Sequence, residues 1–453
     1  MTAMKKPFTG IPAALALLLV SVCGQTQTRQ WSLDECIDYA RANNIELKKT
    51  ALLMKSSKED LLQSKADLLP SLSFSTSHNM SYSPWQESGR STVANGYVQS
   101  SVDKVFYNGS YGINANWTVW NGNRNRNTIK LNKIAAEQAA LDSAETANSI
   151  EEKIIQLYVQ ILYSHETIKV NKESLETARK NEERGTEMMK AGKMSKADVA
   201  QLTAQRAQDE YNIVEAEGLM RTYKLQLKQL LELTESDDFD VLIPEFADSM
   251  ALKDIPKLNE VYAAALENRP EIKNARLAID GSALDIKIAK AGKLPTFGIT
   301  AGVGTNTTTM NDNAWGRQMK TNFDASAGVT VSIPLFDNRH TKTAVNKAVI
   351  QRESNLLELR EKEKQLYSTI EGYWTDAVTN QNKFKAAQAA ADSEEMSYEL
   401  LSEQFRVGLK NIIELMTGKT NMMVAKQNEL QSKYMTIMNI RMLELYKKTN
   451  SEK

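Results

Sequence analysis

The chain of 453 residues has few of the residues that build covalent or metal-based sites. Its two cysteines, Cys23 and Cys36, exclude a disulfide framework and a CxxC metal site. Its three histidines, His78, His165 and His340, lie far apart in the sequence, so no histidine-based ligand cluster is visible. The sequence contains no nucleophile elbow and no phosphate-binding loop. We therefore expect no cofactor and no enzymatic activity.

Net charge and long apolar runs are also missing. Lysine plus arginine and aspartate plus glutamate both number 56, so the formal net charge is zero and the electrostatic case for nucleic-acid binding is absent. Beyond the N-terminus, no segment has the ~18 apolar residues of a transmembrane helix. If the protein enters a membrane, it must do so as strands.

The N-terminal residues 1–24 have the pattern of a secretory signal. Lys5 and Lys6 precede a short apolar run at 13–22, which is too short to span a bilayer. Small residues permit cleavage near residue 24. A cut before Cys23 with lipid attached to it is the alternative, although Val22 departs from the usual small residue at that position. Either way, the mature chain leaves the cytoplasm.

After Pro70 the apolar period changes from 3.6 to 2. Leu72 and Phe74 share one face of a predicted strand, opposite serines, and the same alternation continues through Ile113 and Trp117 of a second strand. The strands exceed the ~5–6 residues usual in globular proteins. A soluble sandwich would also bury one apolar face. The strand length and the small polar residues of the second face favour a membrane sheet, oily outside and polar inside.

Each strand pair is followed by a very long helical pattern. The first runs without proline to about Lys190, turns at Gly192 and returns. Nearly 70 residues at 1.5 Å each reach about 100 Å, which requires a coiled-coil-like rod rather than a compact domain. A second rod turns at Gly408, and both glycines suit a left-handed cap where the chain reverses.

The chain is internally duplicated. The segment before the first strand recurs without a gap at an offset of 225, and the rods match more weakly at an offset of 216. We divide the chain into a signal peptide (1–24), a first repeat (25–233), a connecting module (234–257), a second repeat (258–446) and a tail (447–453). Within the repeats we expect helices at 33–69 and 258–293, strands at 70–83, 105–120, 295–304 and 322–335, loops at 84–103 and 305–321, and helical hairpins at 122–233 and 338–446 with tips at 190–198 and 405–414.

The predicted fold class is thus a membrane α+β protein with four long amphipathic strands per protomer. Four strands cannot close a barrel, and an open edge in lipid leaves backbone groups unpaired. The protomers must share one barrel, to which two chains would give eight strands, three twelve and four sixteen. The helical hairpins would project from one end, so that the assembly forms a conduit.

This arrangement resembles the TolC-like family of outer-membrane efflux proteins over nearly the whole mature chain. The resemblance is carried by the Leu-Pro before each first strand, by the strand ends Trp120-Asn-Gly and Phe336-Asp-Asn, and by the tip motifs Ala-Gly192-x5-Asp198-Val and Phe405-x-x-Gly408-x-Lys410-x3-Glu414-Leu. It implies a homotrimer in outer-membrane lipid, with a shared twelve-stranded barrel and a periplasmic helical tunnel. It also implies two partners, a periplasmic adaptor at the tips and an inner-membrane transporter that supplies the energy.

The resemblance further implies a periplasmic gate. Carried over, Phe405, Lys410 and Asp198 hold the mouth shut, and Glu414 from each protomer forms an acidic ring that favours cations. Phe405 lacks a hydroxyl, so its part can only be packing. In the competing interpretation, Asp198 and Glu414 are ordinary carboxylates at helix starts.

The same turns would serve as the docking surface for the adaptor, through Gly192, Lys193, Gly408 and Leu409. The alternative function is a soluble or surface-attached periplasmic coiled-coil scaffold or adaptor without a channel. Such proteins lack paired amphipathic strands of this length. Cell fractionation separates the two alternatives, because a barrel protein remains with outer-membrane material and a scaffold or adaptor does not. No pattern identifies the exported substrate.

Overall fold

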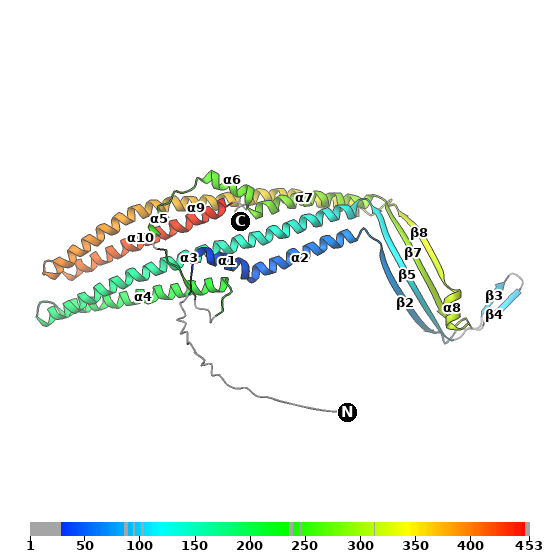
Figure 1. Cartoon of the computed structure of the whole chain (residues 1–453), viewed down its shortest axis with the longest axis horizontal. Coiled ribbons are helices and arrows are strands. Elements are labelled where there is room, and N and C mark those ends of the chain that lie inside the picture. The colour runs from blue at the N-terminus through cyan, green and yellow to red at the C-terminus, as the bar shows by residue number, and fades with distance from the viewer. Residues whose placement is uncertain are drawn as a thin grey trace, which may run out of the picture.

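The computed structural model describes residues 29–85, 89–93, 96–100, 104–234, 239–244, 247–311 and 313–448. The predicted signal peptide with Cys23, and residues 449–453 of the predicted tail, lie outside the described residues. The chain is elongated, with a four-stranded sheet at one end and two helix turns at the other (Figure 1).

Each repeat contributes a short helix, a medium helix and a long helical hairpin. The helices are α1 Leu33–Asn43, α2 Ile45–Ala66, α3 Arg124–Lys190 and α4 Lys196–Leu230 in the first repeat, and α6 Leu258–Asn268, α7 Pro270–Lys290, α9 His340–Arg406 and α10 Ile412–Lys447 in the second. Helices α3 and α9 have 67 residues each, so each is about 100 Å long at 1.5 Å per residue. Among the helices that the structure describes, none combines the length and apolarity needed to cross a membrane.

Local chemistry explains where the shorter helices begin. Ser32 opens α1 with a capping box, because its hydroxyl accepts from the backbone of Glu35 while the Glu35 carboxylate accepts from the backbone of Ser32. Asn44 both ends α1 and caps α2 through its side-chain oxygen. Pro270 stands at the first position of α7, where its missing N–H costs nothing.

The strands form an antiparallel sheet in the order β2-β5-β7-β8. The strands are β2 Ser71–Tyr82, β5 Val105–Asn121, β7 Thr296–Thr308 and β8 Asp324–Ser332. Its register aligns Phe74 with Ile113, Ile113 with Val303, and Val303 with Ala325. Directly opposed residues share a face of the sheet, so the apolar positions of the two repeats combine into one continuous apolar face.

Most of both faces of this sheet is uncovered within one protomer. Leu72 is 74% exposed and Val329 is also 74% exposed, and every residue of β8 is exposed. Strands β2 and β8 are the two edges of the sheet. An apolar face of this size, bounded by two open edges, is typical of a surface that contacts lipid or another chain.

Two details of the strands differ from the sequence-based expectation. A β-bulge between Thr118 and Trp120 shifts the register, so that Trp120 rather than Val119 faces the same side as its partner Phe297. The last strand is shorter than 322–335, ending at Ser332, whereas β7 extends four residues beyond 304.

Neither predicted outer loop is structureless. The segment 84–103 contains the hairpin of β3 Gly89–Val93 and β4 Gly96–Ser100, and the segment 305–321 contains the end of β7 and helix α8 Trp315–Thr321. Gln318 holds the second of these together. Its buried amide donates to the carbonyls of Thr308, Asn311 and Asn313 and accepts from the N–H of Thr308. A single polar residue inside a loop leaves no periodic pattern, which is why α8 escaped prediction.

The connecting segment packs against the middle of the helical rod. Strand β1 Arg29–Trp31 pairs in parallel with β6 Phe239–Val241, and the short helix α5 Ala247–Ala251 follows. The Tyr158 hydroxyl of α3 donates to the carbonyl of Leu242 at 2.6 Å. The largest buried cluster lies here, and it includes Trp31, Ile154, Tyr158, Leu227 and Tyr434.

Candidate functional site at the hairpin tips

The two helix turns lie together at the end of the molecule farthest from the sheet (Figure 1). We call α3 with α4 hairpin 1, and α9 with α10 hairpin 2. Gly192 has φ +73° and Gly408 has φ +82°, and a side chain built on either would meet nothing within 4 Å. The N–H of Lys193 donates to the carbonyl of Met188, and that of Leu409 to Gln404, the six-to-one bond of a Schellman motif. Both glycines therefore reverse the chain in the same left-handed geometry.

Each turn is followed by a capping box. The Ser195 hydroxyl accepts from the N–H of Asp198 at 3.1 Å and donates to its carboxylate at 2.7 Å. In hairpin 2, the side-chain oxygen of Asn411 accepts from the N–H of Glu414 at 3.0 Å, and the backbone N–H of Asn411 donates to the Glu414 carboxylate at 3.1 Å. Both carboxylates thus sit at a helix start, where the N–H groups and the positive end of the helix dipole favour them.

The predicted gate residues lie at the tips, but the predicted ion pair is not formed within the protomer. Lys410 donates to Glu414 at 2.5 Å rather than to Asp198. The hydrogen bond from Lys410 is the main cause that lowers the pKa of Glu414. Among the described residues, Asp198 bonds only to its capping partner Ser195.

Phe405 acts through packing, as the absence of a hydroxyl requires. It is 4% exposed and lies in a buried cluster that joins both hairpins. The other members are Leu202 of α4, Tyr398 of α9, and Ile412, Leu415 and Met422 of α10. Phe405 therefore anchors the end of α9 from inside the tip.

The outer surfaces of the two tips differ. Hairpin 1 presents the exposed lysines 190, 193 and 196, for which the described structure shows no ion pair. Hairpin 2 presents Val407, Leu409 and Ile413, each more than 60% exposed. One tip is basic and the other apolar.

Inside the hairpins, positions that correspond in the two repeats make the same contacts, but the two residue types are exchanged between the first and the second helix. In hairpin 1, Gly185 of α3 leaves room for Leu202 of α4; a methyl group on it would lie 2.5 Å from the leucine. In hairpin 2 the leucine stands on the first helix and the glycine on the second, as Leu401 and Gly418, with the same 2.5 Å approach. The positions correspond at the repeat offset of 216.

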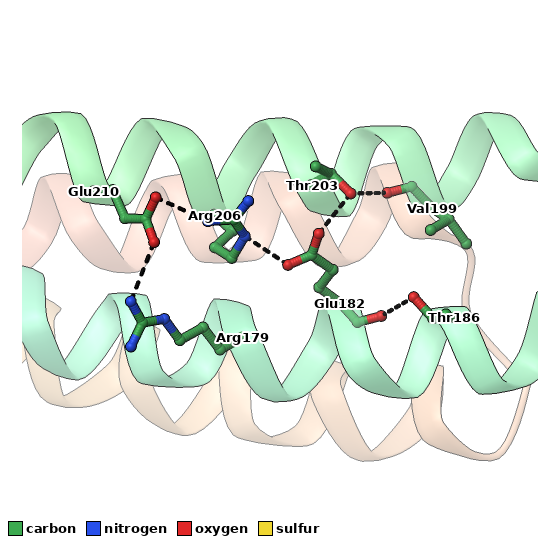
Figure 2. Close-up of polar contacts among 7 residues, drawn as sticks. All are labelled: Arg179, Glu182, Thr186, Val199, Thr203, Arg206 and Glu210. Atoms are coloured by element: carbon green, nitrogen blue, oxygen red, sulfur yellow. Dashed lines mark hydrogen bonds and ion pairs between the residues drawn. The ribbon is translucent and has the colours of Figure 1, made fainter.

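An ion pair is exchanged in the same way. Arg179 of α3 pairs with Glu210 of α4 at 3.1 Å, as Figure 2 shows. The equivalent positions in hairpin 2 hold the opposite charges, and there Lys426 of α10 pairs with Glu395 of α9. The two hairpins are thus more alike in the positions of their contacts than in their residue identities.

The neighbouring layer is polar in hairpin 1 and apolar in hairpin 2. Arg206 bridges Glu182 at 2.6 Å and Glu210 at 2.8 Å, and the Thr203 hydroxyl donates to Glu182 at 2.7 Å (Figure 2). Tyr398 and Met422 occupy the positions of Glu182 and Arg206 in hairpin 2, within the buried cluster.

Lys419 of α10 is the functional candidate that the sequence reasoning missed. It is 1% exposed, and its ammonium pairs with the carboxylate of Asp209 on α4 at 2.5 Å. The ammonium also donates to the carbonyl of Ser174 on α3 at 3.3 Å. Burial is the main cause that lowers the pKa of Lys419. A signal existed, because Lys419 occupies an inward position of the apolar pattern formed by Ile412, Leu415 and Met422.

The site contains no metal-binding constellation. Among the residues that the structure describes, no group of three or more histidine, cysteine, aspartate or glutamate side chains could hold a metal ion. The tips offer packing surfaces, helix caps and ion pairs, which suit docking and gating.

Comparison with known proteins supports one family. The family model described as outer membrane efflux protein matches residues 36–232 and 261–445, one stretch in each repeat. Outer membrane efflux protein BepC of Brucella suis is 21% identical over 338 residues, which cover 72% of this chain and 69% of BepC. Outer membrane protein TolC of Escherichia coli K12 is 20% identical over 449 residues, which cover 95% of this chain and 84% of TolC.

A solved structure supports the same fold. The chain superposes on a crystal structure of CusC with a TM-score of 0.78, at 14% sequence identity and with 92% of each chain covered. At that identity the likeness concerns the fold alone.

Proposed function

The chain belongs to the outer membrane efflux protein family, and we propose that it is a passive exit duct that docks on a periplasmic adaptor and an inner-membrane transporter. The family is one of outer-membrane channel proteins rather than enzymes, with a helical tunnel in the periplasm. The solute crosses the periplasm and the outer membrane inside the protein, and the transporter supplies the energy.

The observation that carries this proposal is the difference between the two ends of the molecule. An uncovered sheet with one apolar face lies at one end, and both hairpin tips lie at the other (Figure 1). The helices between them extend about 100 Å at 1.5 Å per residue. A sheet in the outer membrane therefore places the tips deep in the periplasm, within reach of an inner-membrane complex.

The assembly that we propose is a trimer with one shared barrel. Each protomer offers an open edge at β2 and another at β8. Joining β8 of one protomer to β2 of the next satisfies the backbone groups of both edges, which lipid cannot do. The mass of the detergent-solubilised protein, measured by light scattering with the detergent subtracted, should correspond to three chains. A monomer mass would contradict the shared barrel, and a dimer or tetramer mass would contradict the trimer.

Channel activity is the direct test. Purified protein added to planar bilayers should produce discrete ionic conductance steps. A protein that leaves the bilayers silent would refute the duct. The scaffold alternative predicts that silence, and it also predicts loss of the protein from washed outer membranes.

For docking, we propose that the adaptor covers the apolar surface of hairpin 2 and the basic surface of hairpin 1. A photo-crosslinking amino acid at Leu409 or Lys193 should capture a periplasmic protein in the native cell, to be identified by mass spectrometry. The matched control is Met396, which is exposed on α9 away from the tip. Equal capture at Met396 would show that the tips are not the docking surface.

For the gate, we propose that Lys410 exchanges Glu414 for Asp198 when the mouth is closed, with Phe405 packing behind them. Lys410 and Glu414 are 38% and 39% exposed, so water screens their ion pair and the exchange costs little. The double variant D198A/K410A should then raise single-channel conductance. Ser195→Ala removes the capping hydroxyl but leaves both charged groups, so it should leave conductance unchanged. An unchanged conductance in D198A/K410A would reject the latch.

A further inference from the structure

A group of aromatic side chains lies at the end of the sheet remote from the helical rod, where Figure 1 shows α8. The ring of His78 on β2 lies 5.8 Å from that of Tyr107 and 5.2 Å from that of Tyr111, both on β5. Tyr111 in turn meets the ring of Trp315 on α8 edge to face, at 6.2 Å between centroids. Aromatic contacts thus run without a break from the sheet to α8.

Helix α8 lies over the apolar face of the sheet. Tyr111 and Ile113 are two positions apart on β5, so they share a face, and Thr305 is directly opposite Tyr111 in the register. The Thr305 hydroxyl donates to the carbonyl of Met319 on α8 at 2.8 Å. Together with the bonds of Gln318 to its loop, this contact fixes α8 on the face that is predicted to meet lipid.

A second aromatic group marks the opposite end of the same face. Trp120 of β5 is paired with Phe297 of β7, and their ring centroids are 5.7 Å apart. Trp117 precedes them and is ten positions from Tyr107 on β5, which is about 34 Å along the strand and about 26 Å across a membrane at a tilt of about 40°. Outer-membrane sheets carry an apolar band about 25 Å tall between two aromatic girdles. The two groups therefore match the two membrane boundaries.

The exposed surface of α8 at this boundary is basic. Arg317 and Lys320 are three positions apart, so they are neighbours on the helix surface, and both are exposed. The helix contains no aspartate or glutamate, and neither side chain forms an ion pair with any residue that the structure describes. Trp315 beside them is 57% exposed. Cations next to an amphipathic aromatic ring suit the phosphate oxygens of a lipid headgroup.

We propose that α8 binds a phosphorylated lipid of the outer leaflet, with Arg317 and Lys320 on the headgroup phosphate and Trp315 against the base of its acyl chains. Because the helical tunnel is periplasmic, the end of the sheet that carries α8 faces the outer leaflet. The long basic side chains keep their stems along apolar surface and their charges at the headgroup level. This inference rests on the outer-membrane location and does not depend on the passage of a solute.

The test measures lipid binding to the full chain in detergent by native mass spectrometry, with lipid A carrying two phosphates as the probe. The double variant R317Q/K320Q should weaken the binding about 25-fold, since each basic residue near an anionic surface contributes about fivefold. Phosphatidylcholine, whose headgroup has no net charge, should bind the wild type and the variant equally. Inorganic phosphate should displace lipid A no better than chloride at the same ionic strength, because a free anion does not use Trp315.

The matched control is K383Q/K385Q, which removes two exposed lysines from α9 in the helical rod. Its affinity for lipid A should equal that of the wild type. Wild-type affinity in R317Q/K320Q, or an equal loss in the control, would overturn the inference, and specific displacement by inorganic phosphate would replace the lipid with a free anion. Conductance of the same samples in planar bilayers reports the proposed function separately, so silent bilayers would overturn the duct and leave the lipid result standing.

Discussion

The two hairpins fold to the same shape with different interiors. Both have a helix of 67 residues, a Schellman turn at glycine and a capping box after it. Hairpin 1 is held near its tip by arginine and glutamate, whereas hairpin 2 is held by Tyr398, Phe405 and Met422. The backbone geometry of each hairpin depends on a few turn residues. The side-chain layers next to the turn can be either charged or apolar.

The exchanged pairs also show how a duplicated chain distinguishes its own helices. If α3 paired with α10, Arg179 would oppose Lys426 and Gly185 would oppose Gly418, which combines repulsion with a void. If α9 paired with α4, two glutamates and two leucines would meet. Each hairpin is therefore compatible with its own second helix and not with that of the other repeat. The following predictions test this comparison.

The largest effect is expected at the buried pair. Lys419→Met leaves the Asp209 carboxylate buried without its cation, so the free energy of unfolding should fall by about 3–5 kcal/mol. The measurement is denaturant unfolding in detergent, followed by helical circular dichroism. The equivalent position in hairpin 1 is Thr203, where Thr203→Val loses one neutral donor and should cost about 1 kcal/mol. Equal losses would mean that the two hairpins do not differ here.

The next effect tests the exchanged glycine and leucine. Gly418→Leu places two leucines opposite each other and should lower stability by about 1–3 kcal/mol through overpacking. Adding Leu401→Gly recreates the arrangement of hairpin 1 and should recover most of the loss, in the same unfolding measurement. Gly372→Leu on α9 is the control, because a Cβ atom there meets nothing within 4 Å. No recovery in the double variant would contradict the exchange.

A smaller effect is expected for the exchanged charges. Lys426→Glu opposes two carboxylates and should cost up to about 1 kcal/mol, since Glu395 is 47% exposed and the pair is partly screened. The reversal K426E/E395R should restore the wild-type midpoint and reproduce the polarity of hairpin 1. The comparison should be made at low salt, because added salt weakens both effects. A double variant as unstable as the single one would reject the charge exchange.

The smallest effect concerns pH at the tip of hairpin 2. Lys410 lowers the pKa of Glu414, so the contribution of this cap is complete above the ordinary carboxyl range and is lost as pH falls through the lowered pKa. Amide exchange at the start of α10, corrected for the intrinsic rate, should therefore increase as the solution becomes more acidic. Glu414→Gln keeps an acceptor for the cap but cannot ionise, so its corrected exchange should not depend on pH. Acid-independent protection in the wild-type protein would contradict the assignment.

Several features were predictable because they depend on local chemistry. The change of period after Pro70 and the two tip glycines follow from residues close together in the sequence, and the repeat before the strands follows from comparing the sequence with itself at an offset of 225. The register of the sheet, with Phe74 opposite Ile113, agrees with the predicted apolar face. Helix α8 was missed because the single side chain of Gln318 organises its loop without any periodic signal. The bulge before Trp120 was also missed.

The candidate residues lie at the two helix turns, and the contacts that the structure shows within one protomer differ from the predicted latch. Motif matching located Asp198, Lys410 and Glu414 at the tips, where the structure has them. It paired Lys410 with Asp198, whereas within the protomer Lys410 reaches the nearer Glu414, four residues along the same helix start. Such a pair needs no assembly, because side chains four residues apart at a helix start are neighbours.

The sequence by itself determined where the chain changes from strand to helix and where it reverses, since periodicity, proline and positive-φ glycine act over a few residues. Only the tertiary structure decided which helix lies against which, and so which charges become buried. Lys419 and Asp209 are 210 residues apart, and no local pattern connects them. Their pairing arises from the packing of four helices. Burying either charge alone is strongly unfavourable, and the attraction of the opposite charge offsets that desolvation only in the packed structure.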